Sequence, residues 1–115
     1  MIYLGIDHHK TWDQLVAIND DNEVVLECRV LSTREVWEQL KLTLPKDEPV
    51  CSVLEAGWNW GKLYDVLEEL GLNPKLANAL KVGLIAESHI KTDKRDALAL
   101  AQLLRMGWIP EVHVP

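Results

Sequence analysis

The segment Ile2-Tyr3-Leu4-Gly5-Ile6-Asp7 is the starting point for predicting the architecture of this chain. Its apolar residues at alternate positions predict a buried strand, and Asp7 stands directly at the end of that strand. Two further strands are expected over 15–19 and 24–31, with turn-forming residues at 20–22 between them. Three strands joined by short turns predict an antiparallel meander.

Helices and strands alternate after the meander. Helices are expected from Ser32 to about 44 and over 60–70, 78–87 and 93–106, and short strands over 50–54 and 74–77. The first of these helices opens with a Ser-x-x-Glu capping box, in which Ser32 is the predicted N-cap. This order is typical of a ribonuclease H-like (RuvC-like) α/β domain. We therefore expect one domain over 1–115, with a mixed five-stranded sheet and helices on both faces.

The composition of the 115 residues is that of an ordinary globular protein, 48% hydrophobic and 26% charged. The apolar runs are far shorter than the roughly 20 residues of a membrane span, and the N-terminus does not resemble a signal peptide. Cys28 and Cys51 have no metal-ligand spacing and are expected to be reduced thiols. We therefore expect a cytoplasmic protein without a membrane partner.

Charge is distributed unevenly over a chain whose net charge is −6. Residues 1–70 contain 14 acidic and 6 basic side chains, whereas residues 71–115 contain 4 acidic and 6 basic ones. The net charge argues against a generic basic nucleic-acid coat, but it is compatible with a carboxylate-lined metal site. The basic cluster Lys91, Lys94 and Arg95 has an ordinary explanation as a solvated helix face. It gains significance only if a polyanion site lies beside it.

Four acidic residues are candidate metal ligands. Asp7 and Glu55 each close an apolar strand, where the sites of α/β proteins collect. Asp93 and Asp96 lie about 60° apart around a helix, on the stripe expected to face the core. Buried acids are costly unless paired, and a metal ion is the usual partner of converging carboxylates. The alternatives are loop or capping roles for the first two, a helix N-terminal charge for Asp93 and a Lys or Arg pair for Asp96.

Three segments of the chain resemble a known family. G-I-D-H-H-K at 5–10, L-E-A-G-W at 54–58 and K-T-D-K-R-D-A-L-A-L-A-Q-L-L at 91–104 are similar to DEDD transposases, insertion-sequence recombinases related to the pilin-gene DNA invertases. The resemblance covers essentially the whole chain, as the family's N-terminal RuvC-like domain. It departs from the family at 8–9, where many relatives have small or aliphatic residues. It implies two Mg²⁺ or Mn²⁺ ions and a catalytic, metal-binding tetrad of Asp7, Glu55, Asp93 and Asp96.

The resemblance also implies partners and a second domain. The partners are DNA, at insertion-sequence ends and target, a structured guide RNA and further copies of the chain. The family's serine nucleophile lies on a C-terminal domain, and since this chain stops at Pro115 we expect an excised or truncated product that cannot recombine DNA alone. The basic residues that flank the tetrad are expected to position phosphates; they are Lys10, Lys91, Lys94 and Arg95.

Three other functions are alternatives to that of a transposase. A RuvC-like junction nuclease would cleave DNA without a serine domain. A non-enzymatic scaffold for dimerisation and RNA binding would need no cations, and Asp→Asn changes would stabilise it by relieving acid–acid repulsion. An actin- or hexokinase-like ATPase fragment is disfavoured, because that fold wants Gly and Ser or Thr where His8 and His9 stand.

Three aromatic residues near Asp7 and Glu55 carry expectations of their own. His8 and His9 are expected on the surface or in a loop, because hard two-metal sites prefer oxygen ligands. Trp58 is expected to pack in the core, with stacking on a base as the alternative.

Overall fold

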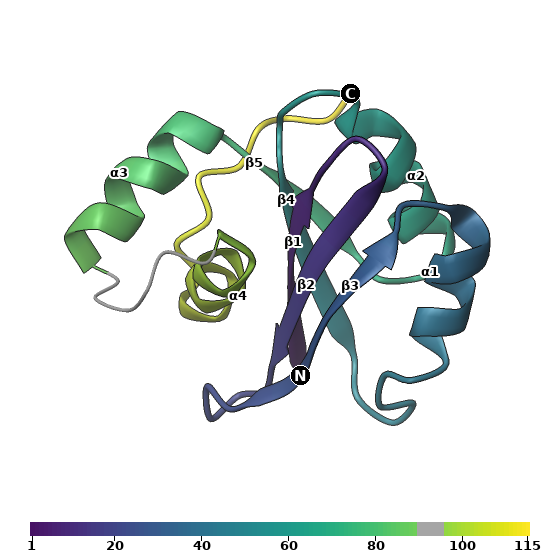
Figure 1. Ribbon diagram of the computed structural model, residues 1–115. Coiled ribbons are helices and arrows are strands. Elements are labelled where there is room, and N and C mark those ends of the chain that lie inside the picture. The colour runs from purple at the N-terminus through teal and green to yellow at the C-terminus, as the bar shows by residue number, and fades with distance from the viewer. Residues whose placement is uncertain (90–95) are drawn as a thin grey trace.

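The computed structural model describes residues 1–89 and 96–115, which form an α/β fold (Figure 1). Strands and helices follow one another in the predicted order. The elements are β1 (Ile2–His8), β2 (Trp12–Ile18), β3 (Val24–Leu31), α1 (Arg34–Lys41), β4 (Val50–Glu55), α2 (Trp60–Glu69), β5 (Pro74–Ala77), α3 (Ala79–His89) and α4 (Asp96–Met106).

The five strands form one mixed sheet in the order β3-β2-β1-β4-β5. The β1–β2 and β2–β3 pairs are antiparallel, which confirms the meander. The β1–β4 and β4–β5 pairs are parallel, as expected for strands reached through helical crossovers. The arrangement confirms the predicted mixed sheet and is consistent with a ribonuclease H-like fold. β1 lies at its centre, which explains why its segment is so apolar.

Helices cover both faces of this sheet, as predicted. α1 and α2 lie on one face, and α3 and α4 lie on the other (Figure 1). Side chains of β1 alternate between them, since Ile2, Leu4 and Ile6 join the core beneath α1 and α2, whereas Tyr3 packs on the α4 side. No helix in the described part of the chain is long and apolar enough to span a bilayer.

A glycine sets how closely α4 approaches the sheet. A Cβ atom on Gly5 would lie 1.9 Å from the carbonyl oxygen of Ala97 and 2.7 Å from the amide nitrogen of Ala101, so only glycine fits there. The other end of the helix is held by Arg105, which donates to the carbonyl oxygen of Asp20 beyond β2. α4 therefore runs antiparallel to β1, and its first turn lies toward the carboxyl end of that strand.

Two local predictions were wrong. The N-cap of α1 is Thr33 rather than Ser32, because Thr33 has extended backbone angles (φ −126°, ψ 153°) and its Oγ1 accepts from the amide of Val36. Trp58 is 65% exposed and not in the core. It lies in the short connection between β4 and α2 rather than on the inward side of either element, so its side chain projects into solvent.

Candidate metal centre at the carboxyl edge of the sheet

Asp7 and Glu55 stand at the carboxyl ends of neighbouring parallel strands. Register pairs Ile6 with Leu54, and the two carboxylates belong to the next residue of each strand. Asp7 shares the face of β1 that carries Gly5, against α4. Glu55 shares the face of β4 that carries Val53, a member of the core cluster beneath α4. Both acids therefore belong to one edge and one face of the sheet.

The first turn of α4 lies close to these two strand ends. Asp96 is the first residue of the helix, and Ala97 touches Gly5, two residues before Asp7. The sequence thus brings the backbone of a third predicted ligand to the same corner of the molecule. Asp93 lies outside the described residues, as do three of the predicted phosphate contacts, Lys91, Lys94 and Arg95. Lys10 is exposed in the turn between β1 and β2.

The carboxylate of Asp7 is held from outside the core by a stack of rings. Its Oδ2 lies 2.9 Å from Nε2 of His9, and the Asp7 side chain is 26% exposed. The His9 ring stacks on Trp12 with centroids 3.8 Å apart and an interplanar angle of 18°. The guanidinium of Arg29 lies over the same indole, 3.8 Å from its centroid. His9 is therefore fixed in place beside a predicted ligand, and its 40% exposure agrees with a surface position.

The donor set suits a hard divalent cation. Asp7 and Glu55 offer carboxylate oxygens, which Mg²⁺ and Mn²⁺ prefer, and both are half-buried rather than sealed in the core. Among the described residues no group of three or more His, Cys, Asp or Glu side chains is close enough to hold a metal. A complete cage would need further oxygen ligands. The contact between Gly5 and Ala97 brings the backbone of Asp96, the first residue of α4, toward this edge of the sheet.

His8 is more buried than His9, and it does not have the surface position that the sequence predicted. Its side chain is only 10% exposed, because it continues the buried phase of β1 on the face opposite Asp7. Its Nδ1 lies 2.6 Å from Oδ1 of Asp13, and Oδ2 of Asp13 accepts a 2.9 Å hydrogen bond from Nε1 of Trp37. Asp13 is completely buried. The surface position expected for His8 was therefore wrong.

Sequence reasoning missed Asp13, although a signal was present. Asp13 is in phase with Leu15 and Ala17, two buried residues of β2. An acid on the apolar phase of a strand predicts a buried partner that can donate hydrogen bonds. His8 is five residues away across the turn between β1 and β2, so this partner could have been found from the sequence.

Comparisons with known proteins identify the family of this chain. A family model described as "Transposase", that of the DEDD transposases of IS110, matches residues 4–114. The transposase for insertion sequence element IS1533 from Leptospira borgpetersenii is 35% identical over 107 residues, which is 90% of this chain and 31% of that relative. The chain thus spans about a third of the length of the relative that it matches. Since both the family model and the relative cover nearly all of it, the chain belongs to the IS110 family of DEDD transposases.

Proposed function

We propose that this chain is the metal-binding part of a transposase that cleaves DNA and transfers the cut strands. The observation that carries the proposal is the placement of Asp7 and Glu55 on one face of two neighbouring strand ends, beside the first turn of α4. Membership of a transposase family supports DNA as the substrate.

Each residue of the tetrad has a role in the proposal. Asp7 and Glu55 hold divalent cations from the strand ends, and Asp96, the first residue of α4, completes the ligand set together with Asp93. Two bound Mg²⁺ or Mn²⁺ ions supply Lewis acidity toward a scissile phosphate and the positive charge that stabilises its leaving oxygen. His9 orients the Asp7 carboxylate through Oδ2. The phosphates beside the site are positioned by Lys10, Lys91, Lys94 and Arg95.

The attacking group in this proposal comes from elsewhere. A serine on a domain outside these 115 residues attacks the phosphate and forms a covalent intermediate. The chain by itself therefore binds metal but does not recombine DNA. A structured guide RNA and assembly into homo-oligomers belong to the same proposal, because the family resemblance implies them.

Strand transfer on DNA that carries the insertion-sequence ends tests this function, with the chain joined to the serine-bearing domain. Asp7→Asn and Glu55→Gln should each lower Mg²⁺-dependent transfer roughly 100-fold or more, the scale expected when a transition-state contact is lost. Asp21→Asn, an exposed acid on the turn after β2, should leave transfer unchanged. Cleavage by the isolated chain with water as nucleophile would instead support a junction nuclease. Transfer that does not depend on Asp7 and Glu55 would contradict the proposal.

A further inference from the structure

The strand β3 forms one edge of the sheet, and no strand in the described part of the chain lies beyond it. The opposite edge is covered by the C-terminal segment. There Ala77 of β5 bridges to Glu111, and the amide of Val112 donates to the carbonyl oxygen of Leu76 over 2.7 Å. β3 is eight residues long and contains neither proline nor glycine. A long edge strand of this kind is a template for pairing with a further strand.

The backbone of β3 directs the amide and carbonyl groups of alternate residues toward the outer edge. In an antiparallel pair, residues that exchange hydrogen bonds with the neighbouring strand alternate with residues whose groups point the other way. The amide of Ser32 donates to the carbonyl oxygen of Thr11 over 3.0 Å, in line with the register of β2 and β3. Cys28, four residues before Ser32, has the same phase and faces β2. Glu27 and Arg29 have the other phase, so their backbone groups point outward.

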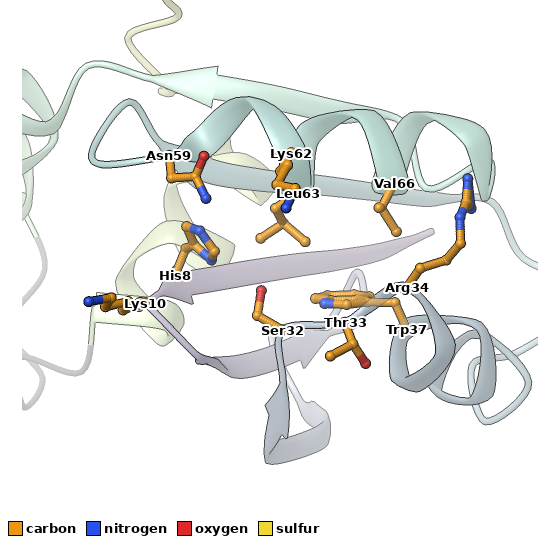
Figure 2. A pocket seen from close by; sticks show the side chains of 10 residues that line it. All are labelled: His8, Lys10, Ser32, Thr33, Arg34, Trp37, Asn59, Lys62, Leu63 and Val66. Carbon is orange, nitrogen blue, oxygen red and sulfur yellow. The ribbon is translucent and has the colours of Figure 1, made fainter.

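The side chains of the same phase are exposed, and two of them are apolar. Val25 is 47% exposed and Leu31 is 61% exposed, with the exposed Glu27 and Arg29 between them. The other phase of β3 packs against the core beneath α1 and α2; it comprises Leu26, Cys28 and Val30. After β3 the chain turns into α1, whose Trp37 points back toward the sheet (Figure 2). α1 therefore covers a face of the sheet rather than its outer edge.

The order of charges makes this edge complementary to a second copy of itself. Only residues with outward groups can exchange hydrogen bonds across the new pair, so a two-fold axis between antiparallel copies of β3 must fall on a residue. An axis at Glu27 or at Arg29 would set like charges directly opposite each other, which is unfavourable in a sheet. An axis at Cys28 sets Glu27 of each copy opposite Arg29 of the other. The same register sets the exposed Val25 opposite the exposed Leu31, so the charged and the apolar pairs match together.

We propose that two copies of this chain associate through β3, paired antiparallel about Cys28, so that their two sheets become continuous. The inference deepens the proposed function, on which the expectation of homo-oligomers rests, and it requires neither metal nor DNA. The guanidinium of Arg29 lies with its carbon 3.8 Å from the ring centroid of Trp12. This contact holds the side chain at the edge, while the N–H groups of Arg29 donate to the Glu27 carboxylate of the second copy. One strand pair is a small interface, so the dimer is weak and depends on concentration.

Sedimentation equilibrium of the 115-residue chain, in EDTA and at concentrations up to ~1 mM, tests the contact. We expect a reversible equilibrium between monomer and dimer. Glu27→Arg and Arg29→Glu each set like charges opposite one another twice across the two-fold axis, and each should raise the dimer dissociation constant about tenfold or more. An equimolar mixture of the two variants should associate like the unmodified chain, because every charge then faces an opposite one. The matched controls Glu68→Arg and Lys62→Glu, both exposed on α2, should leave the dissociation constant unchanged.

Amide hydrogen exchange locates the contact on the chain. The amides of Glu27 and Arg29 should exchange more slowly at high protein concentration than at low, whereas the amide of Cys28, which faces β2, should be protected at both. A monomer at every concentration, a mixture of the two variants that stays monomeric, or a dimer without protection of Glu27 and Arg29 overturns the proposal. Asp7→Asn should dimerise like the unmodified chain, so failure of the metal site and failure of this contact are distinguishable.

Discussion

Asp7 and His8 are adjacent in the sequence, yet they belong to opposite faces of the sheet. The Asp7 side is acidic, partly exposed and covered by α4, whereas the His8 side is cationic and enclosed between α1 and α2. Side chains of a strand alternate between faces, so one residue of displacement moves a group into a different chemical environment. The position of a residue along β1 thus determines which edge of the sheet it reaches, and the alternation of side chains determines which face, and therefore which neighbouring groups, it meets.

The two faces also depend on different parts of the fold. The acidic face requires the close contact between α4 and Gly5. The cationic face requires the buried carboxylate of Asp13, which joins β1 and β2 to Trp37 of α1. A substitution that disturbs the contacts of one face should therefore leave the contacts of the other face intact. The following experiments test this separation.

Gly5→Ala should have the largest effect. The new Cβ would overlap backbone atoms of α4, which cannot rotate away as a side chain would, so the helix must shift. We expect the free energy of unfolding to fall by at least about 3 kcal/mol, the upper end of overpacking effects, in urea denaturation. Gly83→Ala is the control, because it adds a methyl group to open space on α3 and should be neutral or stabilising. A loss below about 1 kcal/mol would show that α4 is not fixed by this contact.

Asp13→Ala should come next, on the other face. It leaves Nδ1 of His8 and Nε1 of Trp37 buried without their acceptor, which should cost about 2–3 kcal/mol of unfolding free energy. Metal binding on the other face of the sheet should persist. Asp47→Ala, an exposed acid, is the control and should change stability little. If Asp13→Ala unfolds no more easily than Asp47→Ala, the buried hydrogen bonds that join Asp13 to His8 and Trp37 do not stabilise the fold.

Trp12→Leu should affect the acidic face alone. It removes the indole that stacks on His9 and lies under Arg29, so the imidazole beside Asp7 loses its support. Residues that orient a metal ligand typically contribute tenfold or more to affinity, and we expect Mn²⁺ affinity to fall about tenfold in calorimetry. Thr11→Ala, a neighbouring exposed residue, should bind Mn²⁺ normally. Equal Mn²⁺ affinity of the two variants would show that the stack does not orient Asp7.

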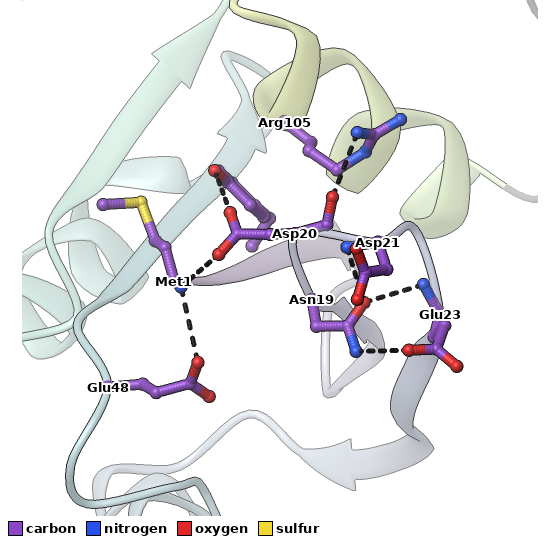
Figure 3. A network of polar contacts seen from close by, with 8 residues as sticks. Met1, Asn19, Asp20, Asp21, Glu23, Glu48 and Arg105 are labelled. Carbon is purple, nitrogen blue, oxygen red and sulfur yellow. Dashed lines mark hydrogen bonds and ion pairs between the residues drawn. The ribbon is translucent and has the colours of Figure 1, made fainter.

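A substitution at the amino end of β1 should have the smallest effect on stability. It serves as a reference, because this end lies away from both candidate regions. There the Met1 amine lies 2.7 Å from Asp20, which also accepts from the Tyr3 hydroxyl (Figure 3). These contacts lower the pKa of the Asp20 carboxyl and raise the pKa of the Met1 amine, chiefly through their shared hydrogen bond.

The two pKa shifts act on stability in opposite directions of pH. The Asp20 contribution is present above its ordinary pKa of 3.8 and is lost as pH falls through the lowered value. The Met1 contribution is present below its ordinary pKa of 8.0 and is lost as pH rises through the raised value. Thermal unfolding from pH 2 to pH 10 should show both losses slightly reduced in Asp20→Asn and retained in Asp21→Asn. If the two variants show identical dependence of melting temperature on pH, this network does not contribute to stability.

The sheet and its acidic edge could be predicted because their signals are local. Alternating apolar residues mark β1, and an acid after each apolar run marks the positions of Asp7 and Glu55. Parallel neighbours bring those ends together once the strand order is known. The roles of all the candidate site residues stay predictions, and four of these residues also lie outside the described part of the chain; they are Asp93, Lys91, Lys94 and Arg95.

The cavity lined by residues of α1 and α2 (Figure 2) could not be predicted, because it forms only when the two helices pack side by side. Ser32, Asn59 and Lys62 are far apart in sequence and resemble ordinary loop and helix residues. The shift of the α1 cap from Ser32 to Thr33 has a related cause. Either residue satisfies a capping pattern, and tertiary packing selects between neighbours that differ little in propensity.

Thermal unfolding with and without millimolar Mn²⁺, measured for the unmodified chain and for Asp7→Asn, is the sharpest test of a metal centre at the carboxyl edge of the sheet. A ligand that binds only the folded state raises its melting temperature. We expect a rise of several degrees in the unmodified chain and none in Asp7→Asn. Without metal, the melting temperature of Asp7→Asn should equal or exceed that of the unmodified chain, because acid–acid repulsion is relieved. No rise in the unmodified chain, or an equal rise in both, would contradict a metal centre at this edge of the sheet.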